Sequence, residues 1–514
     1  MDNHTDLNRM PAYNSRERLV VTALVLLVAA VVIASAWLGD DAYILLRTVD
    51  NALNGHGLRW NIAERVQSYT CPLWTLLLSL IIGMTREFYY TTLIVSLLAT
   101  ALTVAGLLRL ARSPQGAALA LLALLLSKAF VDYSSSGLEN PLTHLLVLAF
   151  VAALEHPDLA PTRRTGLLAL LTALLALNRL DAVVLVAPAL AYHLWQQRSR
   201  RPWAMAGLGL MPLLAWEGFS LLYYGFAFPN TAYAKLYTAI PRGELWTQGM
   251  VYLLDSLTFD PVTLPLMAGT ALAAGLSRQP SLAALMAGPL LYAVYAVSVG
   301  GDFMSGRFFS ASVVLSAAVL ALWPWRAQGP KLRWQIAALW AMLMIILGFQ
   351  GPFPAPLALG DYRASDEWGV VGKSGIADER GMYYRYTGLL SSSRQAGPLT
   401  HEWARQGQNW AGKPAVEAEF SVGFMGFYAG PAVHIVDRLA LNDALLARLP
   451  AKKPWRIGHF ERALPAGYLE SLRTGRNQLA DPQIARLYAQ IQRITRGPLW
   501  DAQRWRDIRD LHID

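Results

Sequence analysis

The stretch GDDAYILLRTVDNALNGHGLRWNIAERVQSYTCPLWT, residues 39–75, contains two adjacent carboxylates, Asp40 and Asp41, directly after the first long apolar segment of the chain. Carboxylates at the end of a membrane helix are costly to keep near hydrocarbon, so they usually mark a site for chemistry, an ion or a substrate. A second interpretation is open, in which Asp40 is the N-cap of a helix over residues 42–53. The pair therefore predicts either a functional site or a helix start at a membrane boundary.

The composition of the whole chain is typical of a polytopic membrane protein. Of its 514 residues, 54% are hydrophobic and 15% are charged, and the mean hydropathy is +0.32. An ordinary soluble protein is less apolar and carries more charge. The net charge is +9, and arginines cluster in short segments between apolar runs, a pattern of membrane topology and not of a nucleic-acid-binding face. The single cysteine, Cys71, excludes an intrachain disulfide framework and a multi-cysteine metal site.

The apolar runs predict a bundle of about eleven membrane spans. The polar N-terminus precedes an uncharged run without a small-residue cleavage site, which indicates an uncleaved anchor and not a signal peptide. Stretches of roughly spanning length cover residues 19–37, 88–108, 113–131, 138–154, 165–178, 182–197, 202–222, 261–277, 279–299, 308–325 and 334–350. The apolar segment 72–84 has only about thirteen residues, so we expect an interfacial or re-entrant helix there.

Charge assigns a side of the membrane to each linker. If 72–84 does not cross, one set of linkers collects the basic residues, and the positive-inside rule places that set in the cytoplasm. These basic residues are Arg112, Arg163, Arg164, Arg198, Arg200, Arg201, Arg278, Arg326, Lys331 and Arg333. We therefore expect a multi-pass protein of the cytoplasmic (inner) membrane.

The opposite, periplasmic or exterior face then holds five unusual polar loops. They are the Asp40-Asp41 loop, SSSGLEN at 134–140, NRLD at 178–181, YYGFAFPNTAYAK at 223–235 and GGDFMSGRFF at 300–309. Acidic, basic, amide and aromatic residues gathered on one face predict a constructed cavity. The alternative is that each loop is a turn or an interface anchor, because Tyr and Trp favour the headgroup belt.

A soluble outer domain is predicted after residue 350. The Pro- and Gly-rich stretch 351–360 is followed by charged residues at the frequency of soluble proteins, so we expect a membrane domain over 1–350 and an outer α/β domain over 351–514. Residues 420–450 show a β-like apolar alternation, a Gly-Pro turn and then an apolar helix that opens near Asn442. Residues 482–512 predict one or two amphipathic, arginine-rich helices.

Such an outward-facing cavity suits transfer of a sugar from a lipid-linked phosphate. The oxocarbenium-like transition state needs a carboxylate that accepts a proton or stabilises positive charge, and Asp40 or Asp41 can supply it. The departing phosphate needs cations; the candidates are Arg179, Lys235 and Arg307. Aromatic residues such as Tyr233 provide a wall for the sugar or the prenyl chain, and Asn230 a hydrogen bond to ring hydroxyls. Further candidates for substrate binding are Glu139, Asp302 and His56.

Several of these residues also have structural interpretations. His56 lies between Gly55 and Gly57, which favours a tight turn. Glu139 precedes Asn140-Pro141 and suits a helix start as well as a binding role. Asp302 and Arg307 are flanked by glycines, which favours a substrate loop over packing.

For three other groups of residues we prefer a structural role. Glu64 and Arg65 are expected to form a surface pair of little energetic weight. Asp437-Arg438 is expected to be a salt bridge, and Asn442 a helix cap; contacts with the acceptor are the alternative for these residues.

Five of these motifs, in this order and followed by the outer domain, resemble the C-type glycosyltransferase superfamily of polytopic membrane enzymes. They are DDAYILLRTVDNALNGHGLRWNIAERVQSYTCPLWT, SSGLENPLT, YYGFAFPNTAYAKL, GGDFMSGRFF and the tail VGFMGFYAGPAVHIVDRLALNDALLARLP. Within the superfamily, the chain is most similar to bacterial arabinofuranosyltransferases that make terminal arabinofuranosyl linkages. The likeness covers nearly the whole chain.

The resemblance implies a polyprenyl-phosphoryl sugar donor, decaprenyl-phosphoryl arabinofuranose, and an acceptor outside the cytoplasmic membrane. That acceptor is a cell-envelope glycan or a surface protein such as pilin. Members of the superfamily have an essential acidic residue in the first outer loop, which matches Asp40-Asp41; the family-like DAY sequence favours Asp41. The resemblance also implies juxtamembrane helices on the outer side. We expect no cofactor and no metal. If a divalent ion is used, Glu139 and Asp302 are the residues that would bind it together with Asp40 and Asp41.

Two other functional classes stay open at this point. A transporter or flippase for a lipid-linked saccharide shares the basic linkers and the polar cavity, although matching pairs of broken helices, frequent in transporters, are not evident. A non-catalytic envelope or motility factor built on the same scaffold is the second alternative.

Overall fold

The computed structural model describes residues 13–197, 199–325, 329–363, 371–395 and 397–513. Arg198 and Arg326, two of the expected cytoplasmic arginines, lie outside the described residues. The chain forms two compact units, each assembled from three separate segments. Unit 1 runs to Trp37 and adds Leu93–Pro212 and Leu245–Ser391, and unit 2 contains Leu38–Thr92, Leu213–Glu244 and Ser392–Asp514. Both units draw on residues from either side of 350, and the boundary expected there stays a prediction.

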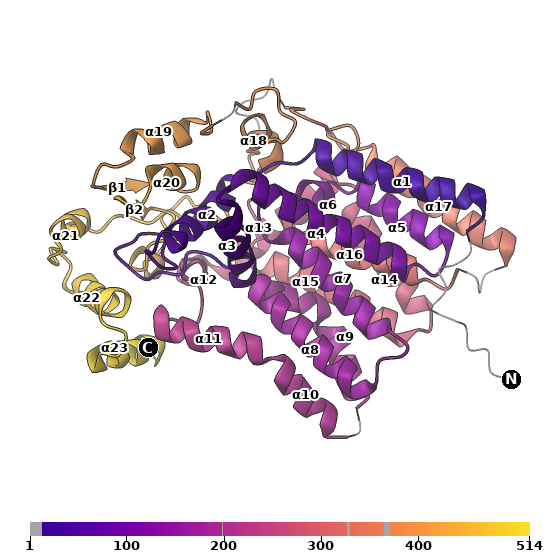
Figure 1. The fold of residues 1–514 in the computed structure, drawn as a ribbon, viewed down its shortest axis with the longest axis horizontal. Helices are drawn as coiled ribbons and strands as arrows, with labels where there is room; N and C mark the ends of the chain where they lie inside the picture. Colours follow the sequence, from indigo (N-terminus) through magenta and orange to yellow (C-terminus); the bar gives the residue numbers. More distant parts are fainter. Residues whose placement is uncertain (1–12, 198, 326–328, 364–370, 396, 514) are drawn as a thin grey trace. The chain divides into compact units, whose positions relative to one another are not determined.

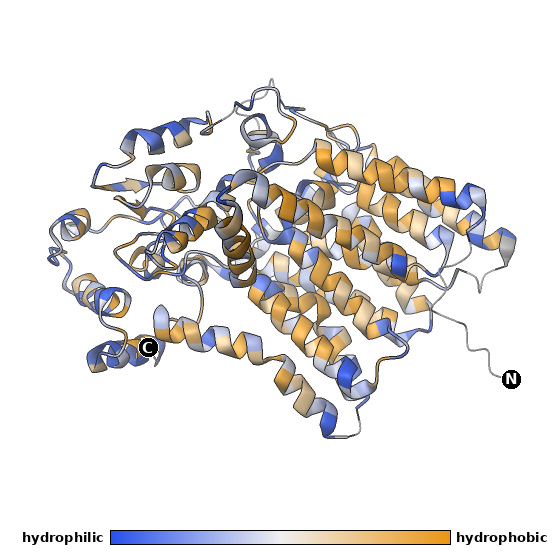
Figure 2. Ribbon diagram, viewed as in Figure 1, coloured by the Kyte–Doolittle hydropathy of each residue, from blue (hydrophilic) through white to orange (hydrophobic). Residues whose placement is uncertain are grey.

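The named elements of the described part of unit 1 are all helices (Figure 1). Its helices are α1 (Ser15–Ala34), most of α4 (Tyr89–Leu110), α5 (Pro114–Leu126), α6 (Lys128–Asp132), α7 (Asn140–Glu155), α8 (Pro161–Asn178), η1 (Leu180–Ala182), α9 (Val183–Trp195), α10 (Arg201–Gly209), most of α13 (Arg242–Phe259), α14 (Thr263–Leu276), α15 (Pro280–Ser298), η2 (Arg307–Phe309), α16 (Ser310–Leu322), α17 (Pro330–Gly348) and α18 (Glu379–Thr387). Apolar residues predominate along α1, α4 and α15 (Figure 2).

Helix α16 is the core of unit 1. Every residue from Ser310 to Leu322 is buried, and the helix packs against α5, α7 and α14. Its sequence SASVVLSAAVLAL is rich in Ala and Ser, and small side chains let membrane helices approach closely. A glycine serves the same purpose between α9 and α15, because a Cβ on Gly288 would lie 1.8 Å from the carbonyl oxygen of Leu185.

In the part of the chain that the structure describes, four helices are long and apolar enough to cross a membrane: α1, α4, α15 and α17. The number rises to six if the bent pairs α10–α11 and α13–α14 each count as one span. Shorter apolar helices cover 72–85, 114–126, 140–155, 180–195 and 307–322. The described helices therefore support a multi-pass protein, and the predicted count of eleven spans goes beyond those that qualify by length and composition.

Unit 2 combines helices with a small parallel sheet. Its elements are α2 (Asp40–Leu53), α3 (Pro72–Thr85), the first turn of α4, most of α11 (Met211–Tyr223), α12 (Asn230–Leu236), α19 (Glu402–Trp410), β1 (Ala415–Glu419), α20 (Phe424–Ala429), β2 (Val433–Asp437), η4 (Leu446–Arg448), α21 (Tyr468–Thr474), α22 (Pro482–Arg496) and α23 (Ala502–Ile513). Strands β1 and β2 pair in parallel, with Ala415 opposite Val433 and Glu419 opposite Asp437. Helix α20 connects the two strands and packs on α19 and α2.

The predicted course of 420–450 is only partly correct. Residues 424–429 form helix α20 and not a strand, while β2 follows the Gly430-Pro431 turn. The helix predicted near Asn442 is wrong: only the short η4 occurs there. The reason is that the buried carboxylate of Asp437 accepts the backbone N–H groups of residues 439, 441 and 442, which fixes a loop in place of a helix start. The amphipathic helices predicted over 482–512 are present as α22 and α23.

Candidate active site

Asp40 and Asp41 occupy the first turn of α2, a position where the helix dipole favours negative charge. The predicted alternative, a cap by Asp40 on this helix, is wrong, because the N-cap residue is Gly39 and Asp40 already has helical geometry. Asp41 is half-buried, whereas Asp40 is only 8% exposed. The two neighbouring carboxyls thus have different environments.

The carboxylate of Asp40 holds the start of α20. Its Oδ1 accepts the N–H of Phe424 at 2.7 Å and its Oδ2 accepts the N–H of Gly423 at 3.2 Å. A Cβ on Gly423 would lie 2.0 Å from the Asp40 carbonyl oxygen, so only glycine permits this approach. Burial raises the pKa of Asp40 to about 7, with a smaller rise from the charge of Asp41, although the two N–H groups oppose both effects.

Arg47 is a second residue of α2 that holds the C-terminal segment in place. Its side chain donates to the carbonyl oxygens of Gly426 at 2.6 Å, Val433 at 2.8 Å and Trp60 at 2.9 Å, and it is 2% exposed. Arg47 was not among the site residues predicted from sequence. The signal was available, since an arginine inside the apolar run ILLRTV is expected to be buried and paired. The position of the Asp40-Asp41 pair is therefore fixed by two independent contacts of α2.

Aromatic rings surround the start of α2. The Tyr43 ring lies 4.8 Å from Phe424 and 5.3 Å from Phe427 between centroids, with edge-to-face geometry in both cases. Phe427 in turn meets Phe88 at 5.2 Å, next to the start of α4. Unit 2 thus contains an acidic pair beside an aromatic cluster, an arrangement that suits contact with sugar rings.

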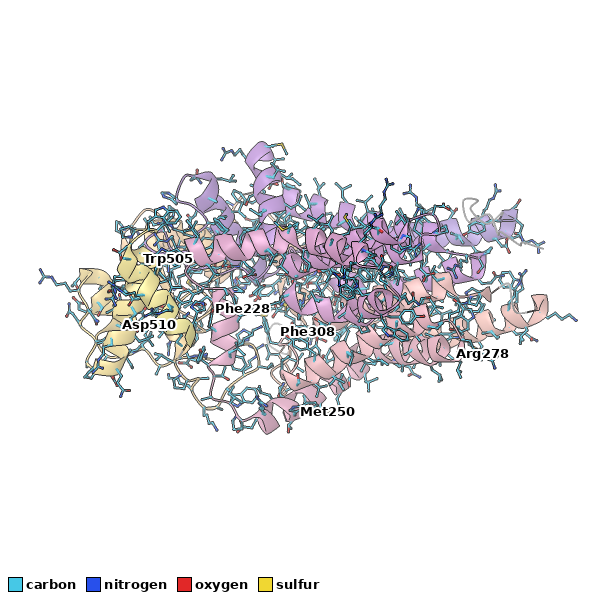
Figure 3. All side chains as sticks on the ribbon, turned by 90° about the horizontal axis from the view of Figure 1, so that it is seen from below. Phe228, Met250, Arg278, Phe308, Trp505 and Asp510 are labelled. Carbon is cyan, nitrogen blue, oxygen red and sulfur yellow. The ribbon has the colours of Figure 1, made fainter. Side chains whose placement is uncertain are left out.

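Four of the predicted site residues meet in unit 1. Glu139 Oε1 lies 3.0 Å from Nη1 of Arg179 and 3.1 Å from Nη2 of Arg307, and Arg307 Nη1 lies 3.6 Å from Asp302 Oδ2. The loops 134–140, 178–181 and 300–309 are therefore brought together, as expected from sequence. Phe308, labelled in Figure 3, lies under the Arg179 guanidinium at 4.8 Å from its ring centroid.

Asp181 and Tyr292 also belong to this cluster, and sequence reasoning did not select them. Asp181 accepts from Nε and Nη2 of Arg179 at 2.8 and 3.0 Å, and from the Tyr292 hydroxyl at 2.8 Å. The signal for Asp181 was the NRLD motif itself, in which the acid follows Arg179 by two residues. Sequence gave no signal for Tyr292.

Carboxylates outnumber guanidiniums in this cluster. Arg179 and Arg307 face Glu139, Asp181 and Asp302, so both guanidiniums are already neutralised. Burial raises the pKa of Glu139, but Arg307 and Arg179 outweigh burial and lower it below its usual value. Glu139 is the N-cap residue of α7, so the expected helix start is present, although its side chain makes no capping hydrogen bond.

The glycine-rich loop 300–309 is bonded to the segment before α18. Ala377 donates its N–H to the Phe303 carbonyl at 2.7 Å, and Ser305 donates to the Ala377 carbonyl at 2.9 Å. Gly301 has a φ of 76°, and a Cβ there would lie 2.4 Å from the Tyr252 side chain. The loop therefore depends on glycine, as the sequence indicated.

A buried charge network beside this loop was also missed from sequence. Arg380 Nε lies 2.6 Å from Asp132, and Lys128 contacts the Tyr362 hydroxyl at 2.9 Å and Asp378 at 3.3 Å. Burial raises the pKa of Asp378, but Lys128, the Tyr362 hydroxyl, Arg380 and Arg363 together outweigh burial and keep that pKa below its usual value. The network links α6 to the segment around α18, two parts of the chain distant in sequence.

Asn230, Tyr233 and Lys235 lie on α12 in unit 2. The Asn230 amide donates to the carbonyl oxygens of Ala440, Leu441 and Asp443 at 2.9–3.1 Å, so its NH₂ group is used within the protein. Tyr233 is half-buried and Lys235 is exposed. Their predicted roles in substrate binding stay predictions.

The structure also describes the surroundings of other polar residues that were singled out from sequence. His56 is half-buried in a turn between Gly55 and Gly57, which both have positive φ, as expected. Glu64 and Arg65 are not a surface pair: both are buried, and Glu64 pairs with Arg496 of α22 at 3.2 Å.

The tail salt bridge also has different partners from those predicted. Arg438 pairs with Glu461 and not with Asp437, because Asp437 accepts backbone N–H groups of its own loop. Asn442 is not a helix cap, since no α-helix starts there.

Among the described residues, no group of three or more His, Cys, Asp or Glu side chains has the arrangement of a metal site. The prediction of a metal-free and cofactor-free protein stays a prediction. An apolar cavity of about 70 Å³, lined by Trp323, Trp325 and Trp340, lies at the far end of α16 from Arg307. A helix of that length spans about 20 Å, so the cavity is separate from the charged cluster.

Comparison with known proteins supports the resemblance read from the sequence. The chain is 27% identical to a terminal β-(1→2)-arabinofuranosyltransferase of Mycobacterium tuberculosis, over 84% of this chain and 81% of the relative. It is 29% identical to a terminal β-(1→2)-arabinofuranosyltransferase of Corynebacterium glutamicum, over 53% of this chain and 46% of the relative. The predicted resemblance to terminal arabinofuranosyltransferases is confirmed. No family model matches the chain.

The fold is similar to that of ArnT from Cupriavidus metallidurans, solved bound to undecaprenyl phosphate. The TM-score is 0.52 at 13% identity, over 85% of this chain and 90% of ArnT. At this identity the likeness concerns the fold alone, and that fold is the C-type glycosyltransferase fold expected from sequence. Together with the named relatives and the apolar helices, it supports a multi-pass membrane glycosyltransferase.

Proposed function

We propose that the chain transfers D-arabinofuranose from a polyprenyl-phosphate donor to an acceptor outside the cytoplasm. The acceptor is a cell-envelope glycan or a surface protein, and the active site and outer domain face the periplasm or exterior. The sugar and the acceptor class follow the names of the relatives and the resemblance read from the motifs. The observation that carries the proposal is the Asp40-Asp41 pair at the start of α2, held against α20 and bordered by aromatic rings.

The two aspartates have different roles in this proposal. Both oxygens of Asp40 accept backbone N–H groups, so Asp40 positions the site. Asp41 is the less buried neighbour and is the proposed general base. It accepts the proton of the acceptor hydroxyl while the hydroxyl oxygen bonds to the anomeric carbon. The bond from that carbon to the phosphate oxygen breaks, and polyprenyl phosphate leaves with the electron pair.

Substitution of each aspartate by asparagine in the full chain tests this function. The assay is sugar transfer in lipid nanodiscs from polyprenyl-phosphoryl arabinofuranose to an arabinan oligosaccharide. Asp41→Asn is expected to lower kcat at least 100-fold, the usual contribution of a general base. Asp40→Asn is expected to lower transfer less.

The matched control is Asp158→Asn, on an exposed loop, which should leave transfer unchanged. Full activity of Asp41→Asn would refute its role as the base. A wild-type chain that moves the lipid-linked sugar across the bilayer and forms no glycosidic bond is a transporter. A chain that does neither is a non-catalytic envelope factor.

A further inference from the structure

Arg394 is held between two tyrosines at the start of a membrane helix. Its guanidinium carbon lies 4.5 Å from the Tyr89 ring centroid and 5.2 Å from the Tyr90 centroid, and Nη2 donates to the Tyr90 hydroxyl at 2.6 Å. Such stacking fixes a guanidinium in place while it leaves the positive charge intact. Tyr89 and Tyr90 are the first two residues of α4. Arg394 itself belongs to the segment between α18 and α19.

The charge of Arg394 has no carboxylate partner among the described residues; its Nε is buried without a hydrogen-bond partner there, and Nη2 donates to the Tyr90 hydroxyl. The nearby Glu87 uses its carboxylate to accept the N–H groups of Tyr89 and Thr91, at 2.9 and 2.8 Å. In contrast, Arg179 and Arg307, the arginines first expected to bind phosphate, share three carboxylates. Arg394 is therefore the better placed of the three to bind an external anion.

The position of Arg394 along α4 matches the depth of lipid phosphates. Helix α4 is a candidate membrane span, and tyrosines at the end of a span favour the interface where the headgroups lie. A cation stacked on those tyrosines lies at the same level. The phosphate of a lipid whose chain stays in the bilayer can therefore reach the guanidinium.

Arg394 is also connected to the acidic pair through aromatic contacts inside unit 2. Phe88, the residue before Tyr89, packs on Phe427, and Phe427 packs on Tyr43 of α2. Burial raises the pKa of the Tyr43 hydroxyl, and the charge of Arg394 is among the groups that oppose this rise. Arg394 thus acts electrostatically on a residue two positions after Asp41.

We propose that Arg394 binds the phosphate of the lipid-linked donor in the site that contains Asp40 and Asp41. This inference rests on the proposed function for the identity of the lipid. A guanidinium offers two parallel N–H donors to phosphate oxygens, and the two tyrosine rings hold it ready to do so. When the sugar leaves, Arg394 balances the charge that develops on the phosphate.

The test measures binding of undecaprenyl phosphate, which has no sugar, to the full chain in nanodiscs of zwitterionic lipid. Native mass spectrometry or tryptophan fluorescence reports the dissociation constant. Arg394→Gln is expected to weaken binding about tenfold, which corresponds to about 1.4 kcal/mol. Arg394→Lys keeps the charge but not the fork and should bind with intermediate affinity. The matched control is Arg476→Gln, an exposed arginine of the same unit, which should bind as the wild type does.

Three outcomes would overturn the inference. The first is equal binding by Arg394→Gln and the wild type. The second is displacement of undecaprenyl phosphate by an equal mole fraction of phosphatidylglycerol, because the site would then bind any lipid headgroup. The third is an unchanged KM for the donor in Arg394→Gln.

A variant that misfolds does not block the test. Tyr90→Phe removes only the hydroxyl that holds Nη2 and should weaken binding about threefold, about 0.7 kcal/mol. An unchanged affinity of Tyr90→Phe counts against the inference.

The test separates this inference from the proposed function. If binding depends on Arg394 but no glycosidic bond forms, the phosphate site is supported and the transferase function is refuted. If sugar transfer is unchanged in Arg394→Gln, the transferase function is supported and the phosphate site is refuted.

Discussion

Replacement of Asp40 by asparagine should change stability in a way that depends on pH. Asp40 is 8% exposed, and its burial raises its pKa from the ordinary value of 3.8 to about 7. Because the folded state then holds the proton more tightly than the unfolded state, the wild type loses stability as pH rises from about 4 to about 7. With 1.36 kcal/mol for each pKa unit, the loss amounts to about 4 kcal/mol.

Asparagine cannot ionise, so the variant avoids this loss of stability, but one of its two side-chain oxygens is replaced by an NH₂ group that cannot accept a hydrogen bond. At pH 5 Asp40 is neutral in the folded protein, and Asp40→Asn should be less stable by about 1–3 kcal/mol, since one of the two N–H groups meets an NH₂. At pH 8 the wild type carries the buried charge, and the variant should be equally or more stable. Part of the 4 kcal/mol is already lost below pH 5, so between pH 5 and pH 8 the difference between the two proteins should move by about 3 kcal/mol in favour of the variant.

Thermal unfolding in detergent, followed by tryptophan fluorescence between pH 4.5 and 8.5, measures this difference. For a chain of 514 residues, 1 kcal/mol corresponds to about 1 °C, so the relative Tm should move by about 3 °C over this range. Asp158→Asn, at an exposed site, should show a constant offset. In Asp41→Asn, the loss of stability caused by ionisation of Asp40 should end at lower pH than in the wild type. The reason is that the neighbouring charge, which raises the Asp40 pKa, is removed. A relative Tm of Asp40→Asn that stays within 1 °C over the whole range refutes the raised pKa.

The sequence was sufficient to find the acidic pair and three loops of the charged cluster, because each carries a local pattern. Asp40-Asp41 follows an apolar run, and the glycines around Asp302 indicate a loop with unusual backbone geometry. What no local pattern supplied was the choice of partners. Glu139 meets two arginines, 40 and 168 residues away along the chain, and only the folded helices bring them together.

The tail was the least predictable part for a related reason. The apolar pattern of 420–450 predicted a strand here, yet the contacts of Asp40 and Arg47 with Gly423, Phe424 and Gly426 stabilise a short helix over 424–429. Long-range contacts from α2 therefore override the local propensity of the segment. The same limit applies to Arg394, because the sequence around a single arginine in a polar segment does not indicate the two tyrosines on which it stacks.

Three further predictions test the contacts that hold the two clusters. Asn230→Ala leaves three carbonyl oxygens without their donor and should lower stability by about 1–3 kcal/mol, seen as a fall in Tm. Its sugar-binding role survives only if the KM for the donor rises as well. Glu139→Gln removes the carboxylate that two half-buried guanidiniums share, while Asp181 and Asp302 stay as their partners, and should cost about 1.5–3 kcal/mol by the same measurement; a cost below 1 kcal/mol would contradict this pairing. Gly423→Ala should lower kcat for sugar transfer about tenfold or more, because its Cβ would lie 2.0 Å from the Asp40 carbonyl oxygen and must move α20 away from the acidic pair. A shift of 1 Å in a catalytic group is enough to cause a loss of this size, so full activity of Gly423→Ala would show that the catalytic pair does not depend on α20.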